Sequence, residues 1–316
     1  MKGTFIGRTL CAIALPVLVL ARCSPGPDPR TDDTPTFGHV LLLADEDLKP
    51  VIEAERLVFE SIYHKATLDI RYLNEAALLK AMQNDSVRCV ISTVAIGGEQ
   101  EAYFRKRQIT PPSVPIWTDA IAVVVNTSRA CDALSVPAIK QLLRDDVIGN
   151  AGPFWRGFEA STSNDVVQPL FAGNGSGVAR TLIDSLQLPG LRAQALPDVD
   201  SVVATVARYP RCIGFVPFGL ISDLDDPHMR ALRDQVKLLA VSRADGSKAV
   251  LPNQSTLADG QYPLRRTVNM LLTEGRSGLG TGFVSFVANH KGQRIILKRG
   301  VAPIKVPARD VEIVHQ

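Results

Sequence analysis

The stretch Phe171–Leu186, FAGNGSGVARTLIDSL, places three glycines and a serine directly before an amphipathic helix. A helix that opens at Ser176 leaves its first backbone N–H groups without partners and presents the positive end of its dipole. Glycines on both sides of that serine allow a ligand to approach the backbone closely. Ser176 is also a favourable N-cap residue, so a plain capped helix is the alternative interpretation. The stretch predicts an anion-binding turn whose candidate residues are Asn174, Gly175, Ser176, Gly177, Val178 and Arg180.

Catalytic and nucleotide-binding motifs do not fit the same stretch. A phosphate loop requires a lysine after its last glycine, and none follows here. The glycine spacing also differs from the dinucleotide pattern G-x-G-x-x-G, and GNGSG is not the nucleophile elbow G-x-S-x-G. A hydrolase that used Ser176 would need a histidine and an acid that the sequence does not identify. The stretch therefore favours binding over catalysis, with no cofactor, and we expect a protein that is not an enzyme.

Upstream of this turn, strands and helices alternate. His39–Ala44 is a short apolar run, typical of a strand covered on both faces, and Leu48–Tyr63 has helical spacing. A second strand, a second helix and a third strand follow at 66–73, 75–83 and 87–93. This βαβαβ order predicts a parallel sheet with right-handed crossovers.

A second α/β unit interrupts the first. The β-rich run Asp119–Asn126 leads into it, and the run at 262–273 brings the chain back. The pattern predicts an α/β protein of two lobes joined by two crossing strands, with a ligand cleft between them. We expect lobe 1 at 37–120 plus 240–316 and lobe 2 at 121–239.

The N-terminus reads as an export signal. Lys2 and Arg8 precede the apolar run Thr9–Ala21, which is too short for a comfortable membrane span. LARC, ending at Cys23, resembles a bacterial lipobox, although Arg22 stands where a small residue is usual. We expect a signal peptide at 1–22, a lipidated Cys23 and a flexible tether at 23–36; plain secretion and an uncleaved anchor are the alternatives.

Composition narrows the function classes. Hydrophobic residues make up 46% and charged residues 21% of the chain, as in globular proteins that bury a core. The net charge is only +3, and without a dense basic tract we expect no nucleic-acid partner. Cys89, Cys131 and Cys212 lack the spacing of a zinc or redox motif. Cys89 and Cys212 lie in apolar runs and are expected to be buried thiols, while disulfide pairing among the three stays open.

Six stretches carry a family resemblance: LADEDLKPVIEAERLVFESIY, TDAIAVVVN, FAGNGSGVARTLIDSL, RCIGFVPFGLISD, GQYPLRRTVNMLL and GLGTGFVSFVANHKGQRIILKRGVAP. Together they resemble the substrate-binding proteins of phosphate ABC transporters, in the lipoprotein subgroup with phosphate-binding-like domains. The resemblance covers roughly Phe37 to Ile313. It implies a type II periplasmic-binding-protein fold, no catalysis, a monomer, and phosphate or a related oxyanion bound between the lobes. It also implies delivery to a membrane permease and a lipid-anchored position on the periplasmic or extracellular side of the envelope.

The residues that the resemblance assigns to the ligand depart from the family pattern. After the first strand, Glu46 and Asp47 stand where hydroxyl residues are usual, and after the third strand Thr93 follows Ser92 in place of an acid or an arginine. The turn pattern R-x-D-G-S-G-T has Ala172, Asn174 and Val178 at its Arg, Asp and Thr positions. A carboxylate about 4 Å from a phosphate oxygen costs on the order of 4 kcal/mol at an effective dielectric of about 20.

The orientation of Asp47 therefore decides how well the expected site holds an anion. We expect Asp47 to cap the helix that begins near Leu48, in which case the site survives, weakened. If Asp47 points inward instead, tight phosphate binding is in doubt. Asp119 is expected to face the cleft, or else simply to start its strand. Arg265 and Arg266 are expected to be ion-paired or solvated.

Two further functions stay open. The substituted positions suit a binding-fold protein with a degenerate site that acts as an envelope sensor or adhesion component. A cation-binding variant would need Asp45, Glu46, Asp47 and Asp119 to converge. We otherwise expect no metal.

Overall fold

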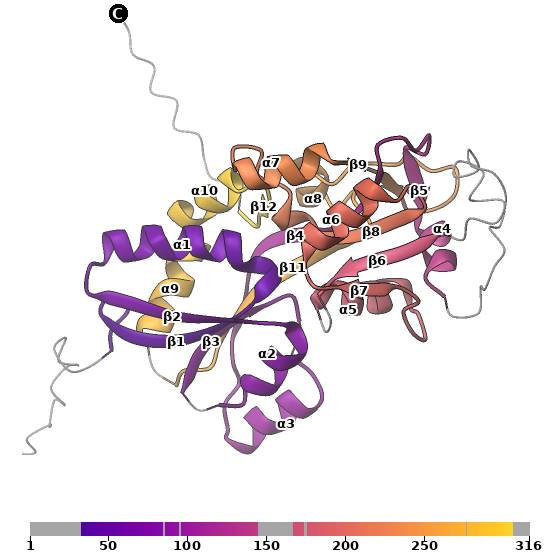
Figure 1. Ribbon diagram of the computed structural model, residues 1–316. Coiled ribbons are helices and arrows are strands. Elements are labelled where there is room, and N and C mark those ends of the chain that lie inside the picture. The colour runs from indigo at the N-terminus through magenta and orange to yellow at the C-terminus, as the bar shows by residue number, and fades with distance from the viewer. Residues whose placement is uncertain are drawn as a thin grey trace, which may run out of the picture.

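The computed structural model describes residues 33–84, 86–94, 96–144, 167–173, 176–275 and 277–305. These residues form an α/β fold around one long mixed sheet, with helices on its faces (Figure 1). The strand order is β2-β1-β3-β11-β4-β8-β6-β7, and β9 and β12 also pair with β4.

The first half of the sheet has the predicted βαβαβ order, which is confirmed. Its central strand pairs in parallel with the strands on both sides. The strand is buried on both faces from Leu42 onward, as its apolar run predicts, and it ends at the buried Asp45. The elements are β1 (Gly38–Asp45), the 3-10 helix η1 (Glu46–Leu48), α1 (Lys49–Ile62), β2 (Ala66–Leu73), α2 (Glu75–Ala81), β3 (Val87–Ser92) and α3 (Glu99–Lys106).

One long strand, β4 (Ser113–Asn126), runs through both halves of the sheet. Its first part pairs antiparallel with β11 (Arg265–Leu272), and its second part pairs with β8 (Cys212–Pro217). The strand is buried from Ile116 onward. Among the described strands, β11 pairs with β3 and with the first part of β4, both in the first half of the sheet. The residues just before β11 therefore carry the chain back from the second half. There the Tyr262 hydroxyl donates to the Ile121 carbonyl at 2.9 Å.

The second half repeats the parallel pairing. β6 pairs in parallel with β7 and with β8. The elements before β8 are β5 (Ala133–Ser135), α4 (Val136–Leu142), β6 (Gln168–Ala172), α5 (Gly177–Leu186), β7 (Gln194–Leu196) and α6 (Val199–Arg208). Those after it are η3 (Phe218–Leu220), α7 (Pro227–Asp234), β9 (Val236–Leu238) and β10 (Ala240–Ser242). β10 pairs in parallel with β5 in a separate two-stranded sheet.

The C-terminal segment returns to the first half. Two consecutive helices follow β11, because the chain leaves helical geometry at Asn289, which caps the second one. The elements are α8 (Gln254–Ala258), α9 (Leu279–Ala288), α10 (His290–Lys298) and β12 (Ala302–Pro303).

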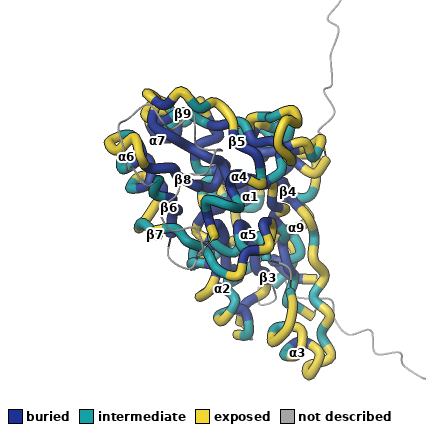
Figure 2. Tube along the Cα trace, turned by 90° about the vertical axis from the view of Figure 1, so that its right-hand side faces the viewer, coloured by how far each residue is buried: buried dark blue, intermediate teal, exposed yellow. Residues whose placement is uncertain are grey.

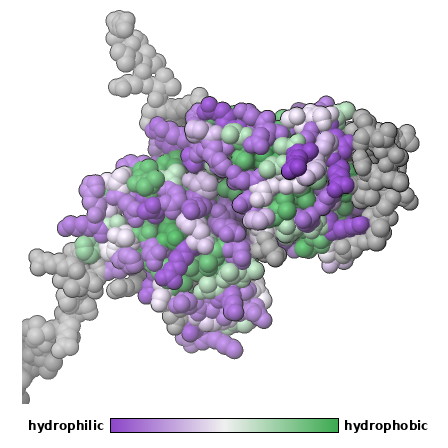
Figure 3. Space-filling model, viewed as in Figure 1, coloured by the Kyte–Doolittle hydropathy of each residue, from purple (hydrophilic) through white to green (hydrophobic). Residues whose placement is uncertain are grey.

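The buried residues lie mainly along the strands of the sheet (Figure 2). The face seen in Figure 3 is mostly hydrophilic with scattered apolar patches. Cys89 and Cys212 are buried as expected, Cys131 is half-buried, and all three are free thiols. Within the described part of the chain, none of the helices has both the length and the apolar content that crossing a membrane requires.

Candidate functional site

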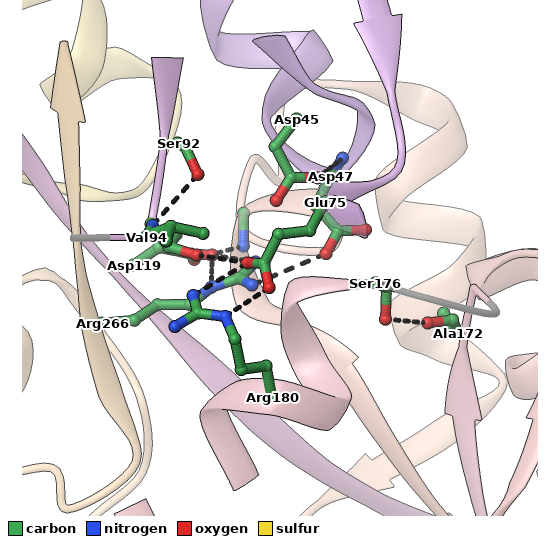
Figure 4. Close-up of polar contacts among 12 residues, drawn as sticks. Asp45, Asp47, Glu75, Ser92, Val94, Asp119, Ala172, Ser176, Arg180 and Arg266 are labelled. Atoms are coloured by element: carbon green, nitrogen blue, oxygen red, sulfur yellow. Dashed lines mark hydrogen bonds and ion pairs between the residues drawn. The ribbon is translucent and has the colours of Figure 1, made fainter. Parts of the chain in front are cut away.

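Titratable side chains from both halves of the sheet meet where β1, α2, β4, β11 and α5 converge (Figure 4). Four carry carboxyl groups and two carry guanidinium groups. We call this set the charge cluster; its members are Asp45, Asp47, Glu75, Asp119, Arg180 and Arg266.

Arg266 is the buried cation of the charge cluster, and its side chain is only 3% exposed. Its Nε donates to Asp119 Oδ2 at 3.0 Å, its Nη2 lies 2.9 Å from the same oxygen, and its Nη1 lies 3.5 Å from Asp47 Oδ2. Burial alone lowers the pKa of a guanidinium, but the carboxylates of Asp119, Asp47 and Asp45 outweigh it and raise the pKa of Arg266. Arg266 is therefore ion-paired, as expected, while Arg265 is exposed.

Asp119 also ties β4 to the chain that follows β8. Its Oδ1 accepts a hydrogen bond from the Gly219 N–H at 2.8 Å, and the residue is 1% exposed. With one oxygen on this amide and the other on Arg266, Asp119 acts as a fixed anchor for the guanidinium. Both of its oxygens are thus engaged within the protein.

The prediction that Asp47 caps the following helix is wrong. Asp45 makes the cap, because its Oδ1 accepts from the Asp47 N–H at 3.1 Å, whereas the N-cap of α1, Leu48, has no side-chain cap. Asp47 instead points inward to Arg266. Burial raises the pKa of Asp45 to about 6 and that of Asp47 to about 8, even though Arg266 lowers both.

Glu75 and Arg180 form an ion pair between the two halves of the sheet. Arg180 Nη2 donates to Glu75 Oε2 at 2.8 Å, and Arg180 Nε donates to Glu75 Oε1. Thr93 Oγ1 lies 3.4 Å from Glu75 Oε2. Glu75 opens α2, while Arg180 lies in the first turn of α5, so the pair joins helices from opposite halves. Asp184, one turn further along α5, lies 3.3 Å from Arg180 Nη1.

The start of α5 faces carboxylates. A Cβ added at Gly177 would lie 2.8 Å from Glu75 Oε2 and 3.1 Å from both Asp45 Oδ2 and Arg266 Nη1, so a larger residue here would crowd these side chains. Ser176 is the N-cap residue but makes no side-chain cap, because its hydroxyl donates to the Ala172 carbonyl at 2.7 Å. Acidic side chains of the chain itself therefore lie at the turn that the sequence predicts for an external anion.

The remaining residues that the sequence assigns to the site have different surroundings in the structure. Ser92 Oγ accepts from the Val94 N–H at 3.0 Å, and Thr93 contacts Glu75. Glu46 is exposed, and the Val178 side chain is fully buried. Asn174 and Gly175 lie outside the described residues.

Glu75 is the functional candidate that sequence reasoning missed. It comes directly after the cap Asn74 at the carboxyl end of β2, and ligands of open α/β sheets bind at the carboxyl ends of strands. This rule could have identified it. Its partner is 105 residues away in the sequence, so the pairing itself left no local signal.

The described residues contain no group of three or more His, Cys, Asp or Glu placed to hold a metal ion. The cation-binding alternative at Asp45, Glu46, Asp47 and Asp119 finds no support in them. Arg266 contacts Asp47 and Asp119 instead, and backbone N–H groups donate to Asp45 and Asp119.

The chain belongs to the family described as the PBP superfamily domain, whose family model matches residues 30–291. The α/β periplasmic-binding-protein fold expected from the sequence is thereby confirmed, as is the resemblance to this class.

Individual relatives point to the phosphate-binding members of the class. The protein SphX of Synechococcus elongatus is 24% identical over 266 residues, which are 82% of this chain and 75% of the relative. The phosphate-binding protein PstS 2 of Streptococcus pneumoniae is 30% identical over 97 residues, which are 31% of this chain and 28% of the relative.

Solved structures share the fold. A protein from Clostridium perfringens, described as a phosphate ABC transporter substrate-binding protein and solved with bound phosphate, has a TM-score of 0.67 at 17% identity. The match covers 85% of this chain and 100% of that protein. An ABC-type phosphate transport receptor from Vibrio cholerae has a TM-score of 0.65 at 11% identity, covering 84% and 100%. These names describe binding and transport rather than catalysis.

Proposed function

We propose that the chain is an extracytoplasmic solute-binding protein that binds phosphate or a related oxyanion between the two halves of its sheet and presents it to an ABC-transporter permease. The observation that carries this proposal is the start of α5, which has no side-chain cap and lies beside two guanidinium groups at the junction of the halves. The phosphate-binding names of its relatives support the choice of solute.

The start of α5 and the two arginines supply what a buried oxyanion needs. The N–H groups at the start of α5 would donate to the solute, and the dipole of a ten-residue helix favours negative charge there. Arg180 would add a charge-assisted bond, and Arg266 would add positive potential from its buried position. Backbone N–H groups at Ser176, Gly177 and Val178 would form one side of the proposed site; Asn174 and Gly175, which the sequence adds to it, lie outside the described residues.

The opposite side comes from the first half of the sheet. Ser92 and Thr93 would supply hydroxyl groups, and Asp119 would hold Arg266 in place. Asp47, with its pKa raised to about 8, is mostly protonated at neutral pH, so it can donate to a phosphate oxygen instead of repelling it. Glu46 would remain at the exposed rim.

Calorimetric titration of the full chain with inorganic phosphate tests the proposal. Arg180→Gln should weaken binding about tenfold or more, since a hydrogen bond to a charged group contributes about 1.5–3 kcal/mol. Arg56→Gln is the matched control, because Arg56 pairs with Glu53 and Glu60 on α1, away from the charge cluster. A folded wild-type protein that shows no heat and no thermal stabilisation with millimolar phosphate would refute the proposed function.

The proposed location is the cell envelope. Cys23 would carry the lipid, and the residues between it and Asp33, whose Oδ1 accepts from the Leu279 N–H at 2.7 Å, would tether a monomeric binding domain to the membrane on the periplasmic or extracellular side. Mass spectrometry of the mature protein should find a lipid-modified N-terminal Cys23. In a Cys23→Ala strain the protein should leave the membrane fraction.

The carboxylates at the start of α5 favour a second candidate, a binding-fold envelope sensor or adhesion component with a degenerate site. Asp45 and Glu75 lie where a solute anion would bind. Genes for a permease and an ATPase beside this gene would argue for transport. Their absence, together with no phosphate binding, would favour the second candidate.

A further inference from the structure

Glu75 has the contacts that a bound anion would have. Both of its oxygens take part in hydrogen bonds with Arg180, and Oε2 lies beside Gly177 and Thr93. The residue is 3% exposed although it carries a carboxyl group. Its carboxylate thus lies at the end of α5 where negative charge is most stabilised.

We propose that Glu75 is an internal ligand of the anion site: it holds the two halves together when no solute is bound, and a solute anion must displace it to bind. This inference rests on the proposed function for the identity of the solute. It goes beyond that function by naming the residue that competes with the solute.

In this exchange the solute anion replaces the Glu75 carboxylate on Arg180. A carboxylate and a phosphate both offer paired oxygens to the fork of a guanidinium, so they compete for the same donors on Arg180. When Glu75 leaves, Arg180 still lies 3.3 Å from Asp184 on its own helix, which keeps the guanidinium at the start of α5. The departing carboxylate moves with α2, because Glu75 is the first residue of that helix.

The competition also sets selectivity. An incoming anion must bind Arg180 and the α5 amides more strongly than a carboxylate does, and it must do so close to Asp45. Inorganic phosphate has more oxygens and, as the dianion, more charge than a monocarboxylate such as acetate. Glu75 therefore excludes weak, singly charged anions from the site.

Two measurements on the full chain test the role of Glu75. In the solute-free protein, nitroxide labels on unnatural amino acids at the exposed positions 80 on α2 and 185 on α5 report the distance between the halves. Glu75→Gln should shift this distance distribution to longer values. The control Glu101→Gln, which breaks the exposed pair with Arg105 on α3, should leave it unchanged.

The second measurement is phosphate affinity by calorimetry. Glu75→Gln should bind phosphate roughly 10- to 100-fold more tightly than wild type, the usual range for a coupling between a ligand and a conformational equilibrium. Glu75→Asp, which keeps the charge but shortens the reach, should change affinity in the same direction and serves if the glutamine variant does not fold. Arg180→Gln should also lengthen the distance but should weaken phosphate binding, which separates loss of the clamp from loss of a phosphate donor.

The outcomes distinguish the two proposals. Unchanged distances in Glu75→Gln, or wild-type phosphate affinity in a folded Glu75 variant, overturn the role of Glu75 and leave the proposed function standing. Longer distances without phosphate binding by any form refute phosphate as the solute but support the clamp.

Discussion

Replacing Arg266 with methionine tests whether the charge cluster is a buried ionic network. The substitution keeps an unbranched side chain of similar length but removes the cation that contacts Asp119 and Asp47. Removing one partner of a buried ion pair costs about 3–5 kcal/mol, because the other charge stays buried without compensation. Since a domain of ordinary stability has about 5–15 kcal/mol, Arg266→Met should fold but unfold at much lower urea concentration.

The pH dependence of this loss follows from the neighbouring acids. Asp45 and Asp47 have folded pKa values of about 6 and 8, above their ordinary 3.8, so folding favours their protonated forms. The stability they contribute is full below about pH 4 and falls as the pH rises through these values. Without Arg266 their ionised forms are still less favourable. The destabilisation should therefore be larger at pH 8 than at pH 5.

Urea unfolding followed by circular dichroism at both pH values measures the effect. A double-mutant cycle with Asp119→Asn should give a coupling energy of about 1–3 kcal/mol at pH 8, in the range for residues that share one ionic network. A loss below about 1 kcal/mol in Arg266→Met at pH 8, with no coupling to Asp119, would show that water reaches the cluster and that the reasoning is wrong.

Three further predictions concern single side chains. Glu55 is 1% exposed, and both its oxygens lack hydrogen-bond partners among the described residues, so burial raises its pKa to about 9. The stability that Glu55 contributes is full below pH 4.5 and should fall by about 3 kcal/mol by pH 7. Glu55→Gln should flatten that part of the pH–stability curve. Gly177→Ala should destabilise the protein by about 1–3 kcal/mol in thermal unfolding because its Cβ would crowd the carboxylates at the start of α5, whereas Gly97→Ala, with open space around its Cβ, should change stability by less than about 0.5 kcal/mol. The phosphate affinity of the wild type should fall as the pH rises through about 8, because Asp47 then ionises. Calorimetry of Asp47→Asn should show a smaller fall. Equal slopes of affinity against pH in the two proteins would contradict a role for Asp47 in the site.

Local pattern was enough to predict much of the fold. The apolar run at the start of the domain and the helical spacing after it specify β1 and α1, because burial on both faces and a 3.6-residue period are properties of short segments. The glycine turn likewise marks the start of α5 at Gly177. The division of the chain into lobes at 120 and 240 stays a prediction.

The direction of the acidic side chains was not predictable in the same way. The sequence alone favoured Asp47 as the helix cap, since an acid just before a helix usually has that role. Asp45 makes the cap instead and leaves Asp47 facing Arg266, a choice that depends on a cation from β11, more than 200 residues further along the chain. Local capping rules contain no information about such a partner.

The sequence by itself determined the segments, the helix start suited to an anion and the family of the chain. Only the tertiary structure decided what lies at that helix start. Glu75 meets Arg180 across 105 residues because the fold brings the two halves of the sheet together. Asp119 meets Arg266 across 147 residues because β4 and β11 pair antiparallel with these two residues opposite each other. The physical reason is that backbone propensity acts between near neighbours in sequence, whereas the pairing of buried charges depends on which segments the folded core brings within a few ångströms of each other.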